Sequence, residues 1–412
     1  MIDAISSLCQ LDFHEEALFP PLYLILYLGM SSFSHLHTHS HYSLLGALPK
    51  IPELVSAAKK FGMKALALTD NGNLYGAIEF FQECKKNDIK PIIGVDAYVA
   101  LRTRHDKQAG VDNTRFRLIL LARDETGYKN LIKLTSLSHL EGFYYKPRID
   151  KELLEKYSEG LTAISPSNSG EIAKALRNKD RKKATDIADR YKNIFGRKNF
   201  FIELTYHPEI PGHAELMKEL LEFAKKENIK VVAAQDIFYI NPEDKKAWQT
   251  LMSVQTNSDR GRHEFDEEEK DFSFRDREQM TEAFKNIPEA LSSVDEIVGS
   301  CNLELKFGSW VFPDFKVESG LSPDKELRRL VCEGLDKRGL KKTKEVEERI
   351  EYELKIINDK GYAPYFLVVG DLLRYAHENG ILTNIRGSVA GSMVTYLAGI
   401  TNVNPIEYGL PF

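Results

Sequence analysis

The sequence predicts an α/β fold for its first 240 residues, in which parallel strands form a helix-covered sheet or a closed barrel. Short, continuous apolar runs alternate along the chain with amphipathic helical patterns, and this alternation is typical of such folds. The composition agrees with the prediction. The chain has 412 residues, of which 42% are hydrophobic and 28% charged, and it is long enough for about two or three domains.

The expected elements follow in order from residue 51. A helix is expected at 51–62, where Pro52 lies near the first turn and Gly62 ends the helix. A strand at 64–70 and a second helix at 76–88 come next. The later segments are expected as strands at 90–100, 116–122, 161–165, 199–204 and 230–234 and as a helix at 211–228.

Polar side chains stand where the expected strands end, and in such folds the reactive groups gather there. They are Asp70, Asn71, Asp96, His207 and Asp236. His37 and His39 lie two residues apart on the expected first strand, so both side chains point to one face. Imidazoles bind zinc or manganese and carboxylates can bridge two ions, so the pattern predicts a divalent-metal site. Taken singly, a strand-end Asp usually caps a helix, and His35 or His41 is expected to be a surface or loop residue.

Four stretches carry a resemblance to a known family. "HLHTHSHYSLL" (35–45), "ALALTDNGNLYGAIEFF" (65–81) and "KPIIGVDAYVA" (90–100) resemble the polymerase-and-histidinol-phosphatase (PHP) domain. "ETGYKNLIKLTSLSHLEGFYYKPRID" (125–150) resembles the version in bacterial C-family polymerases, the DNA polymerase III alpha subunits, more than the stand-alone phosphatases. The resemblance implies a PHP-type distorted parallel α/β barrel over residues 30–240.

The resemblance also implies a metal centre with up to nine ligands, which this sequence keeps only in part. The five residues kept are His37, His39, Asp96, His207 and Asp236. Asn71, Arg117 and Phe238 stand where the family has histidines, and the Asp that usually follows "YSLL" is missing. Arg117 would repel a dication and could itself pair with the leftover carboxylates. We therefore expect a structural rather than hydrolytic domain, while one Zn²⁺ or Mn²⁺ ion in the residual site stays open.

The remaining chain is expected as a connector and a mainly helical region. Residues 241–320 form the connector, with a solvated acidic stretch at 266–269, a helix at 288–301 and an extended passage around Trp310. Helices are expected at 322–340 and 346–361. The second carries an apolar stripe typical of core packing, made of Val346, Ile350, Leu354 and Ile357.

A Gly-Ser motif stands in "NIRGSVAGSMVTYLAGIT", residues 384–401. Glycines let backbone N–H groups approach phosphate oxygens, and serines and an arginine add donors and charge. In isolation the motif could equally be a small-residue turn. Its surroundings, 361–381 and 397–412, resemble the opening of the C-family polymerase palm, where this motif grips the incoming nucleotide. The resemblance implies a truncated palm start at 321–412 with the nucleotide-binding residues Arg386, Gly387, Ser388, Gly391 and Ser392.

The sequence lacks the carboxylates that nucleotidyl transfer requires. Two-metal catalysis needs at least two carboxylates held close together, and the family supplies them in a downstream Asp-x-Asp motif. No Asp-x-Asp occurs here, and the acids after residue 360 are Asp371, Glu378 and Glu407. We expect no catalytic residue in this chain. It is expected to be the N-terminal portion of a polymerase that uses Mg²⁺ at full length.

Two other function classes stay open, a stand-alone metal-dependent PHP phosphoesterase or 3′-5′ exonuclease, and a non-catalytic scaffold. The resemblance implies DNA, deoxynucleoside triphosphates, and replisome subunits such as the sliding clamp and the proofreading subunit as partners. The net charge of -5 confines any DNA-binding surface to a local patch.

The N-terminal stretch is expected to be no membrane anchor. The apolar residues 18–30 are too short to span a bilayer, and no basic residue precedes them, so neither a membrane segment nor a signal peptide is expected. Residues 1–29 are expected to be a non-native extension before Met30. Four widely separated cysteines favour a cytoplasmic protein.

Overall fold

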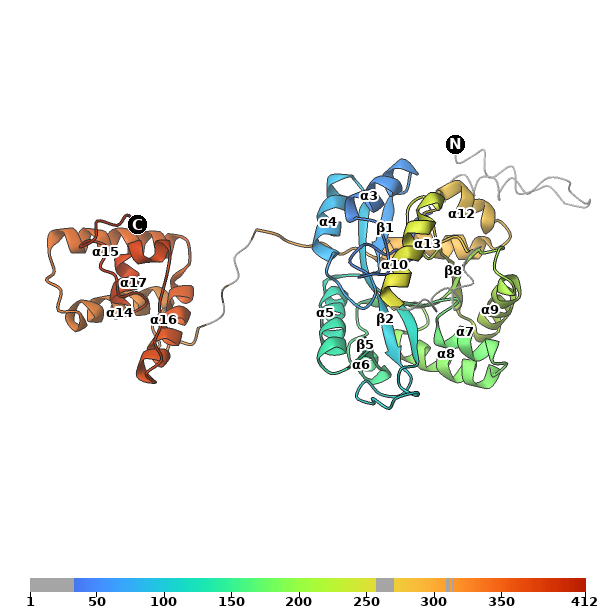
Figure 1. Ribbon diagram of the computed structural model, residues 1–412, viewed down its shortest axis with the longest axis horizontal. Coiled ribbons are helices and arrows are strands. Elements are labelled where there is room, and N and C mark those ends of the chain that lie inside the picture. Colours follow the sequence, from blue (N-terminus) through green and yellow to red (C-terminus); the bar gives the residue numbers. More distant parts are fainter. Residues whose placement is uncertain (1–32, 257–269, 309–311, 313–314) are drawn as a thin grey trace, which may run out of the picture. The chain divides into compact units, whose positions relative to one another are not determined.

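The computed structural model describes residues 33–256, 270–308, 312 and 315–412 (Figure 1). The chain divides into two compact units between Leu305 and Lys306, and each is described by itself. The expected N-terminal extension, the acidic stretch 266–269 and Trp310 lie outside the described residues. None of the helices in the described ranges has the length and apolar character that crossing a bilayer requires.

The first unit is built on one curled sheet. Its strands are β1 (Ala65–Leu68), β2 (Lys90–Ala100), β3 (Arg115–Ala122), β4 (Phe143–Tyr144), β5 (Lys146–Ile149), β6 (Leu161–Ser165), β7 (Phe200–Leu204) and β8 (Lys230–Ala233). Their order is β4-β5-β2-β3-β6-β7-β8, and β1 pairs with the first half of β2. The strands expected from residue 64 onward are confirmed within one or two residues at their ends.

Helices surround this sheet (Figure 1). They are α3 (Ile51–Lys60), α4 (Ala77–Lys86), α5 (Glu125–Leu140), α6 (Lys151–Lys156), α7 (Glu171–Arg177), α8 (Arg181–Phe195), α9 (His213–Glu227), α10 (Lys245–Thr256), α12 (Arg277–Ala283) and α13 (Pro288–Ser300). The helices expected at 51–62, 76–88 and 211–228 are confirmed as α3, α4 and α9. The α/β class of this unit is therefore confirmed.

The sheet is mixed rather than all parallel, which corrects the expectation of a parallel barrel. β3 runs antiparallel to both β2 and β6, and β4 runs antiparallel to β5. The physical reason lies in the connection at 101–114, which contains no helix. Without a helical crossover the chain reverses direction directly, and the next strand pairs antiparallel. As a result, the first residues of β3 lie beside the last residues of β2.

The histidine-rich segment closes the sheet without forming a regular strand. Its backbone makes a single bridge, from Thr38 to Ile237 just after β8, instead of the strand expected there. On its other side, the N–H groups of Ala67 and Thr69 donate to the carbonyls of His35 and Thr38. This segment therefore lies between the end of β1 and the residues that follow β8.

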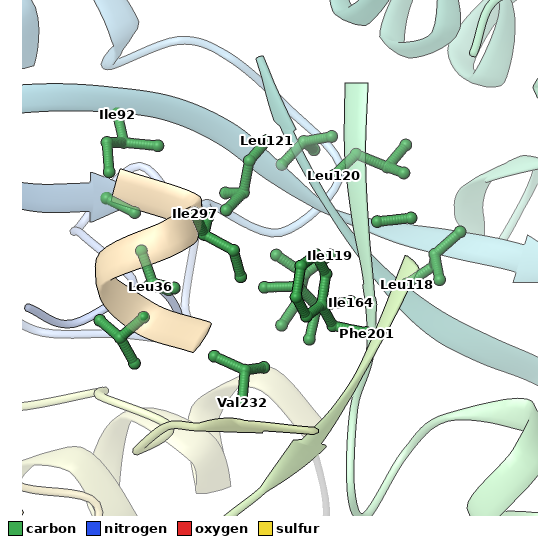
Figure 2. Packing of buried hydrophobic residues seen from close by; sticks show 14 of the residues in the cluster. Leu36, Ile92, Leu118, Ile119, Leu120, Leu121, Ile164, Phe201, Val232 and Ile297 are labelled. Carbon is green, nitrogen blue, oxygen red and sulfur yellow. The ribbon is translucent and has the colours of Figure 1, made fainter. Parts of the chain in front are cut away.

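The interior of the first unit is filled by apolar side chains from the sheet and from one late helix. Figure 2 shows Ile119, Ile164 and Phe201 of neighbouring strands packed together with Ile297 of α13. α13 packs along β8 within this core. The compact unit thus extends to Leu305, and the first part of the expected connector 241–320 belongs to it.

The second unit is a small helical domain. Its elements are α14 (Pro323–Lys337), α15 (Lys344–Asp359), α16 (Ala363–Glu378), the 3₁₀ turn η2 (Ser388–Gly391) and α17 (Met393–Leu397). The expected stripe of α15 is buried in one apolar core with residues of α14, α16 and α17, and α15 packs against α17. The helices predicted at 322–340 and 346–361 are therefore confirmed, together with the core role of the stripe.

Candidate functional site

The predicted metal residues meet at one end of the curled sheet. His37 comes from the closing segment, Asp96 from β2 and Asp236 from the turn after β8. Because β3 is antiparallel, its amino-terminal residue Arg117 reaches the same end as the carboxyl ends of the parallel strands. The topology thus gathers three expected ligands and one arginine into one site.

His37 lies at the centre of three carboxylates. Its Nδ1 is 2.8 Å from Glu203 Oε2 and 2.5 Å from Asp236 Oδ1, and its Nε2 is 3.3 Å from Asp96 Oδ2. Burial alone would lower the pKa of His37, but Asp236 and Glu203 outweigh burial and raise it well above 6.5. In turn, His37 overcomes the effect of burial on Asp236 and lowers the pKa of that carboxyl. This geometry favours an imidazolium that neutralises its neighbours.

Arg117 binds the remaining carboxylate with two nitrogens. Its Nε donates to Asp96 Oδ1 at 2.9 Å, and its Nη2 donates to Asp96 Oδ2 and to Asn71 Oδ1. Its guanidinium lies over the ring of Tyr98, 4.2 Å from the centroid. Burial alone would raise the pKa of Asp96, but the Arg117 guanidinium holds it well below 3.8. Both oxygens of the best-placed carboxylate are therefore occupied by a cation of the protein itself.

His39 is held beside this pair by stacking. Its ring lies parallel to that of Phe238, with centroids 4.4 Å apart, and its Nδ1 is 3.2 Å from the Ile237 carbonyl. Its Nε2 is buried, lies 3.5 Å from Asp96 Oδ2 and has no hydrogen-bond partner. This orphaned nitrogen is the one free ligand atom that the described residues present to an ion near Asp96.

His207 does not join the ligand groups found among the described residues, contrary to its expected role. Its Nδ1 is 3.0 Å from Glu209 Oε1, and its ring packs against those of His213 and Phe272. Although burial opposes it, the His207 hydrogen bond lowers the pKa of Glu209 to about 2. A partner two residues along the chain thus occupies one ring nitrogen of this histidine.

Sequence reasoning missed Glu203. This carboxylate stands in the buried strand β7, where it accepts hydrogen bonds from the backbone N–H and the hydroxyl of Ser167 and contacts His37. The available signal was a charged residue inside the apolar run "FFIEL". Such a residue is costly to bury without partners, so it marks a polar cluster.

Two other polar residues considered in the sequence, His35 and Asp70, are buried. His35, expected as a surface or loop residue, lies in the irregular segment before Thr38 but is fully buried, and burial lowers its pKa to about 4. Asp70 is a structural residue, because it accepts hydrogen bonds from the Ser40 and Ser43 hydroxyls and fixes the turn after the histidine run. Neither side chain belongs to the ligand groups described next.

Two groups of three residues could each hold a metal ion, and both contain His37. They are His37, His39 and Asp96, and His37, Glu203 and Asp236. Asp96 is already neutralised by Arg117, and His37 shares its two nitrogens between the groups. A dication would have to displace a guanidinium and a proton. The residues present therefore do not fit a multi-ion centre.

The Gly-Ser motif of the second unit is split between an exposed and a buried half. Arg386, Gly387 and Ser388 are exposed, whereas Gly391 and Ser392 are buried. A Cβ at Gly391 would lie 2.1 Å from the Pro411 carbonyl oxygen, so this glycine is required by chain packing. The structure thus does not bring all five expected nucleotide-binding residues to one surface.

Glu353 occupies the buried half of the motif. It is fully buried, and its carboxylate accepts the Ser392 hydroxyl at 2.7 Å and the N–H groups of Met393 and Val394 at 2.9 Å each. Arg349 binds the same carboxylate at 2.6 Å and also donates to the Gly391 carbonyl. An internal anion therefore already satisfies the donors at the start of α17.

Each of the two units matches a known protein family. A family model for the PHP domain matches residues 35–207, and one for the bacterial DNA polymerase III alpha NTPase domain matches residues 325–412. DNA polymerase III subunit alpha of Borreliella burgdorferi is 40% identical over 389 residues, and that of Aquifex aeolicus is 38% identical over 402 residues. These matches cover 93% and 92% of this chain. The chain belongs to the DNA polymerase III alpha-subunit family.

The matches to these alpha subunits cover 34% of the length of each relative, so the chain spans about a third of them. The expected combination of a PHP domain with a following DNA polymerase III alpha domain is confirmed. A putative metal-dependent phosphoesterase of known structure from Bifidobacterium adolescentis is 10% identical, with a TM-score of 0.36 over 49% of this chain and 86% of that one. A likeness of that degree carries no weight for function.

Arg117→His should convert the PHP site of this alpha-subunit chain into one that responds to metal. Loss of the guanidinium leaves Asp96 buried without its partner, so without metal the free energy of unfolding should fall by about 3 kcal/mol or more. Zn²⁺ should then restore stability, because binding to the folded state raises the melting temperature. Thermal unfolding with EDTA or with Zn²⁺ measures both effects.

Arg115→His is the matched control, since this residue lies two positions earlier on β3 and makes no bond to Asp96. It should leave the response to Zn²⁺ unchanged. Stabilisation of the unaltered chain by Zn²⁺, or an Arg117→His variant without any response, would contradict the assignment of Arg117.

Glu353→Gln should loosen the start of α17. The amide removes the charge opposite Arg349 and turns a donor toward backbone N–H groups, which should cost about 3 kcal/mol or more in the second unit. Hydrogen exchange of residues 392–397 should accelerate accordingly. Glu351→Gln is the control on the same helix, where an exposed pair with Arg328 contributes less than about 1 kcal/mol. Equal hydrogen-exchange rates at residues 392–397 in the two variants would contradict the structural role of Glu353.

Proposed function

We propose that this chain is the part of a replicative DNA polymerase III alpha subunit that carries a non-hydrolytic PHP domain and the start of the nucleotide-binding domain. The family membership supports the polymerase context. The observation that carries the proposal for the PHP domain is the bond of Arg117 to both oxygens of Asp96. It puts a fixed cation where a metal-dependent hydrolase needs an exchangeable one.

Metal-dependent phosphoester hydrolysis requires an ion with an open position and an activated water. In this chain Arg117 and His37 supply two positive charges against the three carboxylates of Asp96, Glu203 and Asp236. Only about one net negative charge is therefore left to attract a dication. A stand-alone phosphoesterase or 3′-5′ exonuclease is therefore the less favoured reading. In our proposal the domain serves as a folded platform of the larger subunit.

In the full-length subunit, the polymerase reaction would use carboxylates and Mg²⁺ that this chain's sequence does not supply. The proposed substrates are DNA and deoxynucleoside triphosphates, and the proposed partners are other replisome subunits in the cytoplasm, including the sliding clamp and the proofreading subunit. The exposed half of the Gly-Ser motif offers Arg386 and the Ser388 hydroxyl toward a triphosphate. In this proposal Ser392 does not contact the triphosphate. Its hydroxyl donates to Glu353 and so helps to hold the motif in place.

The 412-residue chain should hydrolyse neither phosphate monoesters nor DNA 3′ ends with added Zn²⁺, Mn²⁺ or Mg²⁺, and should not extend a primed template. The reason is the same in both assays, since each reaction needs carboxylates free to hold ions. Release of phosphate and of labelled nucleotide are the measurements. Hydrolysis that disappears in His37→Ala but persists in His105→Ala, an exposed histidine, would revive the phosphoesterase reading.

Arg386→Ala should weaken the binding of a deoxynucleoside triphosphate about tenfold, because one charge-assisted hydrogen bond contributes about 1.5–3 kcal/mol. Binding should already be weak and nearly independent of the base, since one arginine supplies only part of the countercharge. Equilibrium dialysis with labelled nucleotide measures it. Arg374→Ala is the control, an exposed arginine on α16 that pairs with Asp371. Equal affinity of the two variants for the triphosphate would indicate that the motif is a turn without a role in nucleotide binding.

A further inference from the structure

A cavity of about 640 Å³ opens over the PHP site and has a strongly basic lining. It reaches from Asp96 and Asp236 at its floor to the residues around the start of β3 and of α7. The cations that line it are Arg115, Arg117, Lys146, Lys174 and Arg177. They come from three separate elements, β3, β5 and α7, so the topology rather than one charged stretch brings them together.

The positive charge of this cavity is not balanced by its own carboxylates. Asp96 and Asp236 are the acidic residues in the lining, and they are neutralised by Arg117 and His37. Within the described ranges, the other four cations form no ion pair with any carboxylate. Arg115 donates to the Asn113 carbonyl, and Arg177 donates to the side chain and carbonyl of Asn168. The four remaining cations give the lining an excess of about four positive charges, which Glu203, in contact with His37 outside the lining, lowers to about three. A bound anion would neutralise this excess.

Three of these cations converge on one aromatic ring. The charged groups of Arg115, Arg117 and Lys146 lie 5.6, 4.2 and 6.0 Å from the centroid of Tyr98. Like charges at such separations repel, and the face of the ring offsets only part of that cost. A multiply charged oxyanion among them would relieve the repulsion. The arrangement therefore has the electrostatic character of an anion site rather than of a cation site.

The donors match a phosphate group in kind as well as in charge. Guanidinium groups offer paired N–H donors that fit phosphate oxygens, and lysines add mobile point charges. Neutral donors from Thr114 and Ser169 line the same cavity. Its volume exceeds that of one phosphate, so it also has room for the sugar of a phosphate monoester.

We propose that this cavity is a metal-independent binding site for a phosphate group, either free or carried by a nucleotide. In this chain Arg117 and the rim cations take over the anion-binding role that metal ions would otherwise fill. The inference concerns binding alone and does not depend on the absence of hydrolysis. It is also separate from the Gly-Ser motif, which lies in the other unit.

The experiment measures binding to the full chain by equilibrium dialysis in excess EDTA, with labelled inorganic phosphate and with labelled deoxyadenosine 5′-monophosphate. Both probes should bind, and rising salt should weaken both. The double variant Arg115→Gln/Lys146→Met should lower affinity at least about tenfold, and Lys174→Met should lower it severalfold. Equal affinity for the two probes assigns the site to the free anion. Tighter binding of the nucleotide assigns it to a nucleotide-borne phosphate.

Two controls keep the result specific. Lys182→Met removes an exposed lysine of the neighbouring helix α8 outside the cavity and should change nothing. Arg386→Ala should also leave this binding intact, which separates it from the proposed nucleotide contact of the second unit. Unchanged melting temperatures show that the variants fold. The proposal is overturned if neither probe binds in EDTA, if binding requires Zn²⁺ or Mn²⁺, or if the cavity variants bind as tightly as Lys182→Met.

Discussion

The ion pair between Arg117 and Asp96 is the interaction on which the character of the first unit depends. A guanidinium that holds both oxygens of a buried carboxylate removes the charge that would attract a metal ion. It also forces the remaining carboxylates to find another cation, and His37 supplies it. The excess of positive charge at the cavity above comes instead from Arg115, Lys146, Lys174 and Arg177. Arg117 itself occupies the position in which a metal ion would meet Asp96.

In the second unit a buried anion, rather than a buried cation, occupies a predicted ligand site. There the start of α17 offers backbone N–H groups and a serine hydroxyl, which are typical donors to a phosphate, but Glu353 accepts them. In each unit a buried charged side chain of the protein therefore occupies a position at which the sequence predicts a ligand. Such buried charges stabilise only when fully paired, and Arg349 completes the pairing of Glu353 as Arg117 completes that of Asp96.

The sequence was informative where local pattern decides structure. The apolar runs located the strands, and the histidine pair with Asp96 and Asp236 located the site, because the carboxyl ends of parallel strands gather at one edge. The pairing of Arg117 with a carboxylate was also predicted. What local pattern could not give was strand direction, which depends on the connection at 101–114 and on long-range pairing. Spacing in the sequence also does not reveal which side chains will meet. It could not show that Glu209 bonds His207, that Glu203 joins the site, or that Glu353 accepts the Ser392 hydroxyl of the Gly-Ser motif.

The pairing of Arg117 with Asp96 can be tested in a crystal structure of the chain grown with excess Zn²⁺, with anomalous data collected at the zinc absorption edge. This pairing predicts no anomalous peak among His37, His39 and Asp96, and an Arg117 guanidinium still bound to both Asp96 oxygens. A strong peak at that position, with the arginine swung away from Asp96, would contradict it.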